Sequence, residues 1–133
     1  MSERISLLVT VKAYPAVSTK YGEAVCIAGV RTDLERPEWV RLFPVEYREL
    51  PWQNRFKKYQ QISLDAQRHG TDQRPESYRP DMSTLQCGDF LDTKDRWERR
   101  RSIVEPLAVE SMCDVIRRQQ LDRTSLGMFR PAV

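Results

Sequence analysis

The chain has 133 residues, a length that fits a single domain. Its 40% hydrophobic and 31% charged residues are typical of a soluble globular protein with one core. No apolar run approaches the roughly 20 residues of a membrane-spanning helix, and the start, MSERISLLVTVKAYP, lacks the shape of a secretory signal. We therefore expect a cytoplasmic protein with no membrane partner.

Four segments are predicted to be β-strands, because β-branched, apolar and aromatic residues gather in them. They are Ile5–Lys12, Glu23–Val30, Trp39–Pro44 and Tyr59–Gln67. In the third, the alternation predicts that Val40 and Leu42 face one way and Trp39, Arg41 and Phe43 the other. Arg41 would then stand beside two rings, either as a lid on the core edge or as an exposed binding residue. In the fourth strand, Ile62, Leu64 and Ala66 are predicted to share the inner face.

Glycine and proline residues at the strand ends and between the predicted strands predict how the strands are connected. Gly29 near the end of its strand predicts a bulge or a close backbone approach. Pro51 breaks any long helix over residues 45–58, so we expect a short helical turn or a loop there. From His69 to Asp81 one glycine and two prolines predict a long irregular loop, and Leu85–Cys87 would be a short strand after it.

The last third is predicted to be helical. Thr93 is a candidate cap for a helix over residues 94–104, and Pro106 ends that register. A second helix, over about Leu107–Gln120, would have an apolar face formed by Val109, Met112, Cys113 and Ile116. Strands followed by helices predict an α+β fold, with a small antiparallel or barrel-like sheet of about four to six strands and then two short helices. Within one domain, the sheet would take residues 1–90, the helices 91–121 and a tail 122–133.

Basic and aromatic residues alternate between Trp39 and Tyr59. Bases stack on rings while phosphates pair with Lys and Arg, so this pattern suits a nucleic-acid-binding module; a half-buried strand shows the same alternation. The net charge of +3 is small, but residues 1–70 hold eleven basic against eight acidic residues, and residues 71–133 hold eleven of each. The candidate DNA- or RNA-binding residues are Arg41, Trp52, Arg55, Lys57, Lys58, Tyr59, Arg99, Arg100 and Arg101.

The segment RPESYRP, residues 74–80, offers a second candidate site. Arg74 and Arg79 could clamp a phosphate or carboxylate by forked hydrogen bonds. The alternative is that Arg and Glu side chains hold the loop to its own barrel, with Tyr78 packed beneath it.

Two further functions stay open. A protein partner or a second copy of the chain could dock on Leu107–Val133, whose apolar residues are unpaired at the end of the sequence. An enzyme acting on a nucleotide or nucleic acid could use Lys20, Glu23, Cys26 and Arg41, although no familiar catalytic or nucleotide-binding motif is present. Cys26 lies between Val25 and Ile27, which favours a buried, inert thiol.

Metal sites and disulfides have no signature in this sequence. The three cysteines, Cys26, Cys87 and Cys113, stand far apart, and His69 is the one histidine. This spacing argues against a disulfide framework and against a structural zinc site, so we expect reduced cysteines, no metal and no cofactor.

Several segments together resemble a family of uncharacterised bacterial proteins. They are KAYPAVSTKYGEAVCIAGVR (12–31), WVRLFP (39–44), FKKYQQI (56–62), RPESYRP (74–80) and TSLGMFRP (124–131). The resemblance brings no activity and no catalytic residue with it. It implies that family members continue past SLGMFRP, so that this chain would be a short or truncated member.

Overall fold

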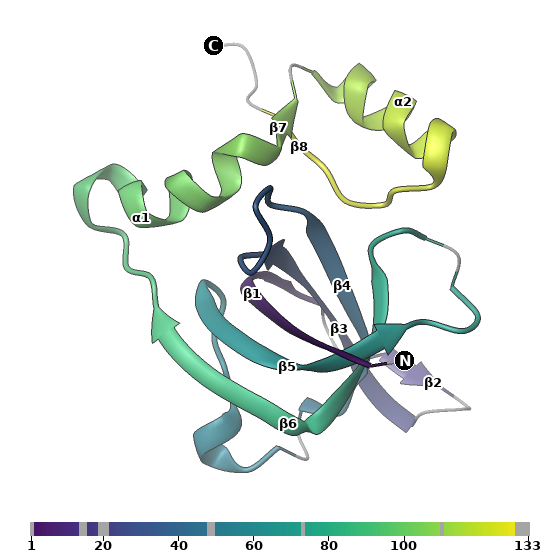
Figure 1. The fold of residues 1–133 in the computed structure, drawn as a ribbon, viewed down its shortest axis with the longest axis vertical. Coiled ribbons are helices and arrows are strands. Elements are labelled where there is room, and N and C mark those ends of the chain that lie inside the picture. The colour runs from purple at the N-terminus through teal and green to yellow at the C-terminus, as the bar shows by residue number, and fades with distance from the viewer. Residues whose placement is uncertain are drawn as a thin grey trace.

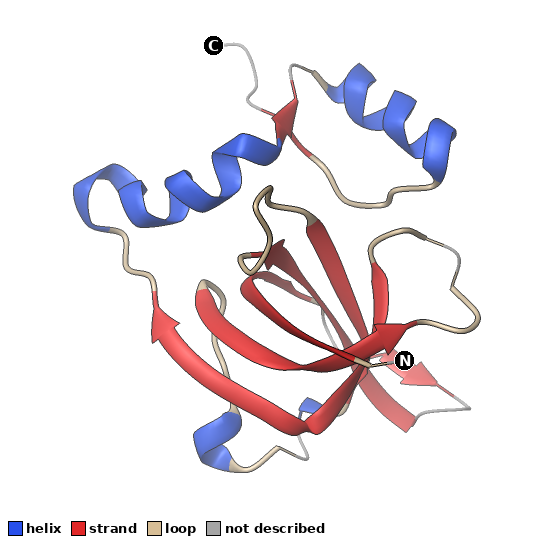
Figure 2. Ribbon diagram, in the orientation of Figure 1, coloured by secondary structure: helices blue, strands red, loops and turns tan. Residues whose placement is uncertain are grey.

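The computed structural model describes residues 2–13, 16–18, 22–47, 50–72, 74–109 and 111–129; for residues 16–18, 22 and 23 it describes the backbone alone. The strands of the main sheet are β1 (Glu3–Lys12), β2 (Ala16–Ser18), β3 (Gly22–Arg31), β4 (Trp39–Val45), β5 (Gln60–Arg68) and β6 (Ser77–Phe90). A short 3-10 turn, η2 (Trp52–Asn54), follows β4, as expected for residues 45–58. The strands curve round a common centre, and the helical segment lies against one side of them (Figures 1 and 2).

Five of these strands close into a barrel. β1 pairs antiparallel with both β3 and β5, which joins the two edges of the sheet. β3 pairs antiparallel with β4, and β5 pairs antiparallel with β6. The last seam, between β4 and β6, is short and parallel. The prediction of an α+β fold with a barrel-like sheet and two helices after it is therefore confirmed, although the sheet is mixed rather than purely antiparallel.

The barrel interior is built from the alternating side chains of these strands. Val40 and Leu42 are buried while Trp39, Arg41 and Phe43 are half-buried on the outer side, so the predicted phase of this strand is confirmed. The predicted inner face of β5 is also confirmed. The core cluster includes Ile5, Leu7, Val9, Val25, Ile27, Val40, Leu42, Phe56, Ile62, Leu64 and Ala66. Each large aliphatic side chain buried in this way stabilises the fold by about 1.5–3 kcal/mol.

Gly29 marks the closest approach of β1 and β3. It pairs with Val9, and a Cβ atom at residue 29 would lie 2.1 Å from the carbonyl oxygen of Leu8. The expected close backbone approach is thus confirmed.

The region after β5 differs from the expectation of a loop over His69–Asp81. The loop ends at Glu76, and β6 then runs for 14 residues, so that Leu85–Cys87 belongs to one long strand. Tyr78 anchors this strand because its side chain is buried in the core. The recorded pairing with β4 ends at Tyr78, and an unpaired strand edge tolerates Pro80, which lacks an N–H donor.

The C-terminal segment contains α1 (Lys94–Val104), η3 (Glu105–Leu107), β7 (Ala108–Val109), α2 (Met112–Asp122) and β8 (Met128–Phe129). The bounds of the first predicted helix are confirmed, but residues 95–97 have positive φ, so its first turn is left-handed. Thr93 occupies the N-cap without a side-chain capping bond.

The second helix begins later than predicted. Pro106 lies in η3, and a capping box between Ser111 and Asp114 starts α2 at Met112 rather than at Leu107. β7 and β8 pair in parallel, which gives the expected tail a regular element. Among the helices in the described ranges, none is long and apolar enough to cross a membrane.

Candidate functional site

Exposed rings stand beside cations in two places, on the segment between β4 and β5 and where β6 runs into α1. We define the basic–aromatic surface by Trp52, Arg55, Lys57, Phe90 and Trp97. The guanidinium of Arg55 lies 5.4 Å from the Trp52 ring, and Trp52 is 81% exposed. The ammonium of Lys57 lies 5.6 Å from the ring of Phe90, which is 46% exposed, and Trp97 is 50% exposed. Lys58 is also exposed. Trp52, Arg55, Lys57 and Lys58, four of the candidate binding residues, are thus exposed in the structure.

Arg100 has a different place from the one expected. Its guanidinium lies 3.9 Å from the Tyr59 ring and 5.2 Å from the Trp97 ring, and its Nε donates to the Leu91 carbonyl at 2.8 Å. Because Arg100 is only 8% exposed, it holds α1 against the barrel and cannot reach a phosphate together with its neighbours. The ring of Tyr59 packs against the Arg100 guanidinium in this contact.

The neighbours of Arg100 remain at the surface. Arg99 lies 3.9 Å from a carboxylate oxygen of Asp92, and Arg101 donates to Glu105 at 2.9 Å. Both pairs are exposed, so they are screened by solvent and add little stability.

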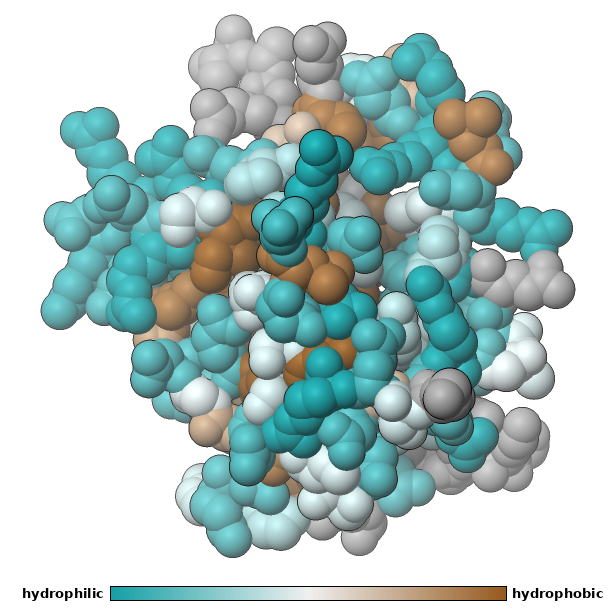
Figure 3. Space-filling view, viewed as in Figure 1, coloured by the Kyte–Doolittle hydropathy of each residue, from teal (hydrophilic) through white to brown (hydrophobic). Residues whose placement is uncertain are grey.

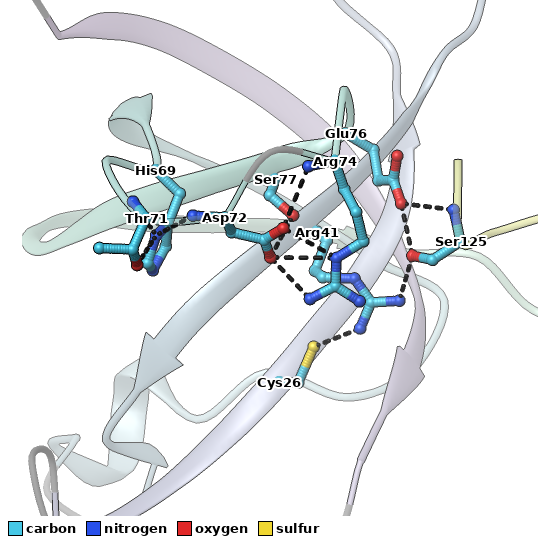
Figure 4. Close-up of polar contacts among 9 residues, drawn as sticks. All are labelled: Cys26, Arg41, His69, Thr71, Asp72, Arg74, Glu76, Ser77 and Ser125. Carbon is cyan, nitrogen blue, oxygen red and sulfur yellow. Dashed lines mark hydrogen bonds and ion pairs between the residues drawn. The ribbon is translucent and has the colours of Figure 1, made fainter. Parts of the chain in front are cut away.

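A polar cluster gathers on the outer side of β4 (Figure 4). We define the Arg41 cluster by Cys26, Arg41, Glu76 and Ser125. The parallel pairing of β4 with β6 places Arg41 beside the start of β6, where the Arg41 amide donates to the Glu76 carbonyl at 2.7 Å. One guanidinium nitrogen of Arg41 donates to the Cys26 sulfur at 2.9 Å and the other to the Ser125 hydroxyl at 2.8 Å.

Glu76 is the buried acid of this cluster. It is 4% exposed, and its Oε1 accepts from the Ser125 amide at 2.8 Å and from the Ser125 hydroxyl. Within the described ranges, its Oε2 and the Arg41 Nε are buried polar atoms with no hydrogen-bond partner. Buried polar atoms are satisfied in the great majority of cases, so two such atoms in one cluster point to a functional constraint.

The β5–β6 loop borders the Arg41 cluster. Asp72 accepts a hydrogen bond from the Arg74 guanidinium at 2.6 Å and another from the Ser77 hydroxyl at 2.8 Å. These hydrogen bonds, chiefly the one from Arg74, lower the pKa of Asp72 well below its usual range. The His69 ring stacks on Phe43 of β4, with 6.5 Å between ring centres. The polar side chains of this loop therefore bind one another, and Tyr78 is buried in the core, as the alternative to an anion clamp predicted.

Arg74 and Arg79 do not form the expected clamp. Arg74 binds Asp72, whereas Arg79 lies on β6 and lines an open cleft of about 330 Å³ with Pro44, Glu46 and Met82. Arg74 lies in the β5–β6 loop and Arg79 on β6, so the two guanidiniums are not carried by one loop as expected.

The candidates for an enzyme site are only partly described. Lys20 lies outside the described residues, and so does the side chain of Glu23. Cys26 is half-buried rather than fully buried, in contrast to the expectation. Its recorded partner is the Arg41 guanidinium at 2.9 Å, which is a hydrogen-bond donor and not a general base.

Sequence patterns did not single out Ser125, Phe43 with His69, or Phe90 as site residues. Ser125 binds Glu76, which lies 49 residues earlier in the chain, and no local spacing of residues predicts such a contact. For Phe90, the available signal was an aromatic residue at the end of a polar strand segment.

Comparison with known proteins gives one result. A family model described as a domain of unknown function, DUF8758, matches residues 3–106. No curated protein and no solved structure matches the chain. The matched region contains the barrel, α1, Arg41 and Glu76, while Ser125 lies outside it. The chain therefore belongs to the family of domains of unknown function designated DUF8758.

Proposed function

We propose that this protein is a non-enzymatic module that binds single-stranded nucleic acid. The observation that carries the proposal is the basic–aromatic surface, in which the exposed rings of Trp52 and Phe90 each lie within 6 Å of a cation. Bases stack on exposed rings with about 1–3 kcal/mol each, and adjacent cations hold the phosphates between them.

The lysine charges beside this surface are available for phosphate. Lys57 and Lys58 are exposed, and no ion pair is recorded for either within the described part of the chain. Arg55 lies in the same loop, so residues 55–58 contribute three cations to this surface. The two lysines attract a polyanion without the competition from carboxylates that Arg99 and Arg101 experience.

The architecture supports the same proposal. Five-stranded Greek-key barrels include the OB fold, which binds oligonucleotides on the face of its second and third strands. The second and third strands of this barrel are β3 and β4, and the outer side of β4 carries Arg41 and Phe43. A fold alone does not determine a function, so this likeness supports the class of ligand, and the exposed rings and cations outside β3 and β4 supply the binding chemistry.

Fluorescence anisotropy with labelled single-stranded oligonucleotides of about 12 nucleotides tests the proposal, since site sizes of about 4–16 nucleotides are usual for one barrel. We expect binding that weakens linearly in a log–log plot against salt, with a slope of several units. Lys57→Glu with Lys58→Glu should abolish binding at physiological salt, and Trp52→Ala should weaken it about tenfold without changing thermal unfolding.

The matched control reverses two exposed charges elsewhere. Arg36→Glu with Arg118→Glu changes the net charge equally, on the β3–β4 loop and on α2. Equal losses in both double variants would show a general charge effect, and no anisotropy change at low salt would refute the proposal.

We also propose, as a second candidate function, self-association through α2. Met112 and Ile116, one turn apart on this helix, are 54% and 48% exposed, and Leu121 near its end is 81% exposed. Figure 3 shows apolar surface at the right-hand end of α2 within a mostly hydrophilic surrounding. Exposed apolar side chains of this kind mark protein contacts when they form a continuous patch.

The variants for this test follow from the packing. Val115 is unsuitable because it packs against Gly127, where a Cβ atom would lie 2.9 Å from it. Met112→Glu with Ile116→Glu should convert a dimer to a monomer in light scattering while the barrel stays folded. A wild-type monomer at about 100 μM, well above the micromolar range of specific contacts, would exclude this function.

A further inference from the structure

We propose that Arg41 and Glu76 form a site for a ribose 2′-hydroxyl, so that the nucleic acid bound is RNA rather than DNA. This inference rests on the proposed function and adds the substrate class to it. It starts from the way in which the Arg41 cluster holds the hydroxyl of Ser125 (Figure 4).

The Ser125 hydroxyl is held as a donor and as an acceptor at once. It donates to the Glu76 carboxylate, and it accepts from the Arg41 guanidinium at 2.8 Å. A 2′-hydroxyl has the same two capacities, and it is the group by which proteins distinguish RNA from DNA. Carboxylates that bind ribose hydroxyls in dinucleotide sites use the same chemistry.

The Glu76 carboxylate favours a hydroxyl over a phosphate at the position of the Ser125 hydroxyl. Glu76 is 4% exposed, so a phosphate oxygen at the Ser125 position would meet a buried negative charge with no donor of its own. A hydroxyl supplies that donor. The site is therefore suited to a sugar, while the cations of residues 55–58 are suited to the backbone.

Two further atoms show that Ser125 does not complete the site. Within the described ranges, Glu76 Oε2 and Arg41 Nε are buried without a hydrogen-bond partner. An internal ribose of RNA offers its ring oxygen as a further acceptor beside the 2′-hydroxyl, which suits Arg41 Nε and which serine lacks. Both Arg41 and Glu76 lie in the region matched by the family model, and Ser125 does not.

The Ser125 hydroxyl then occupies the place that the 2′-hydroxyl would take, so RNA must displace Ser125 in order to bind. Residues 123, 125 and 127 are exposed and residues 124, 126 and 128 are half-buried, and none of them belongs to the core cluster, so this segment can leave without opening the barrel core. Removing the Ser125 hydroxyl should therefore strengthen RNA binding.

The decisive experiment compares three oligonucleotides of one sequence on the full wild-type chain: RNA, DNA and 2′-O-methyl RNA. We expect RNA to bind about tenfold tighter than DNA, the range of one hydrogen bond to a charged group. The 2′-O-methyl strand cannot donate to Glu76, so its affinity should fall to that of DNA or below.

Two variants then assign the preference to the site. Ser125→Ala should raise RNA affinity several-fold and leave DNA affinity unchanged, whereas Glu76→Gln should remove the RNA preference. If Glu76→Gln does not fold, the 2′-O-methyl comparison on the wild-type chain decides alone.

The outcomes separate the two proposals. Equal affinity for all three strands, unchanged in Ser125→Ala, would overturn the hydroxyl site and leave nucleic-acid binding intact; the Ser125 contact would then be a tether for the C-terminal segment only. Absence of binding to every strand at low salt would instead refute the proposed function, and the hydroxyl site with it.

Discussion

The guanidinium of Arg100 lies 3.9 Å from the ring centre of Tyr59, with the Trp97 ring 5.2 Å away from the same group. This contact joins α1 to the barrel, because Tyr59 immediately precedes β5 and its carbonyl accepts from the Leu91 amide at 2.8 Å. A cation–π contact of a desolvated guanidinium is worth about 2 kcal/mol.

Arg100→Ala should therefore destabilise the protein by about 2–4 kcal/mol, since it also removes the Arg100 hydrogen bond to the Leu91 carbonyl. Urea unfolding followed by tryptophan fluorescence measures the loss. Arg99→Ala is the matched control, because Arg99 is exposed and its replacement should change stability by no more than about 0.5 kcal/mol. Similar effects at both positions would contradict the structural role assigned to Arg100.

Gly29→Ala should be among the most destabilising single methyl additions in this chain. The new Cβ would lie 2.1 Å from the Leu8 carbonyl oxygen, so the β1–β3 seam would have to separate. We expect a loss of about 3 kcal/mol or more, or an insoluble product. Gly70→Ala provides the comparison, because nothing lies within 4 Å of its added Cβ, and its melting temperature should stay close to that of the wild type.

The Asp72–Arg74 pair should contribute stability that depends on pH. The pKa of Asp72 is lowered chiefly by its hydrogen bond to Arg74, so its contribution is present above the ordinary carboxyl pKa of about 4 and is lost as pH falls through the lowered value. The difference in stability between wild type and Asp72→Asn should therefore be largest at neutral pH and shrink from about pH 5 to about pH 2.

Thermal unfolding at several pH values measures this difference. Arg74→Gln should remove the same pH-dependent part. Asp33, whose pKa is lowered by Arg31, keeps a separate acid-sensitive contribution in both variants. A constant difference at all pH values would show that Asp72 acts through packing instead of charge.

Ser111→Ala should loosen α2 without affecting the barrel. Ser111 and Asp114 form a reciprocal capping box, and loss of such a cap costs about 1 kcal/mol. Hydrogen exchange should therefore become faster in residues 112–122 and stay unchanged in β1 and β5. Ser102→Ala, which removes a hydroxyl bound to the Arg99 carbonyl on α1, should leave α2 unchanged.

Much of the barrel could be predicted from the sequence, because strand alternation is local. The inward side chains of β4 and β5 follow from every second residue being apolar, and Gly29 signals the close approach of two backbones. The extent of β6 escaped this reasoning, because Pro75 and Pro80 favour a loop locally, whereas burial of Tyr78 favours a strand.

The candidate sites also include contacts that the sequence predicts and contacts that it does not. Exposed cations and rings close in sequence, such as Trp52 with Arg55, were predictable because they neighbour each other in the chain. The role of Arg100 was not, because its ring partner Tyr59 lies on a distant segment that only the folded barrel brings beside α1.

The sequence by itself determined the fold class, the faces of the strands and the region of surplus positive charge, since each depends on neighbouring residues. The tertiary structure alone decided that Arg100 is buried and that Glu76 holds Ser125 across 49 residues. Both depend on closure of the barrel and on the return of the C-terminal segment to β4. Contacts between residues so far apart in the sequence are stabilised by burial and hydrogen bonding between distant segments, and no local residue pattern encodes them.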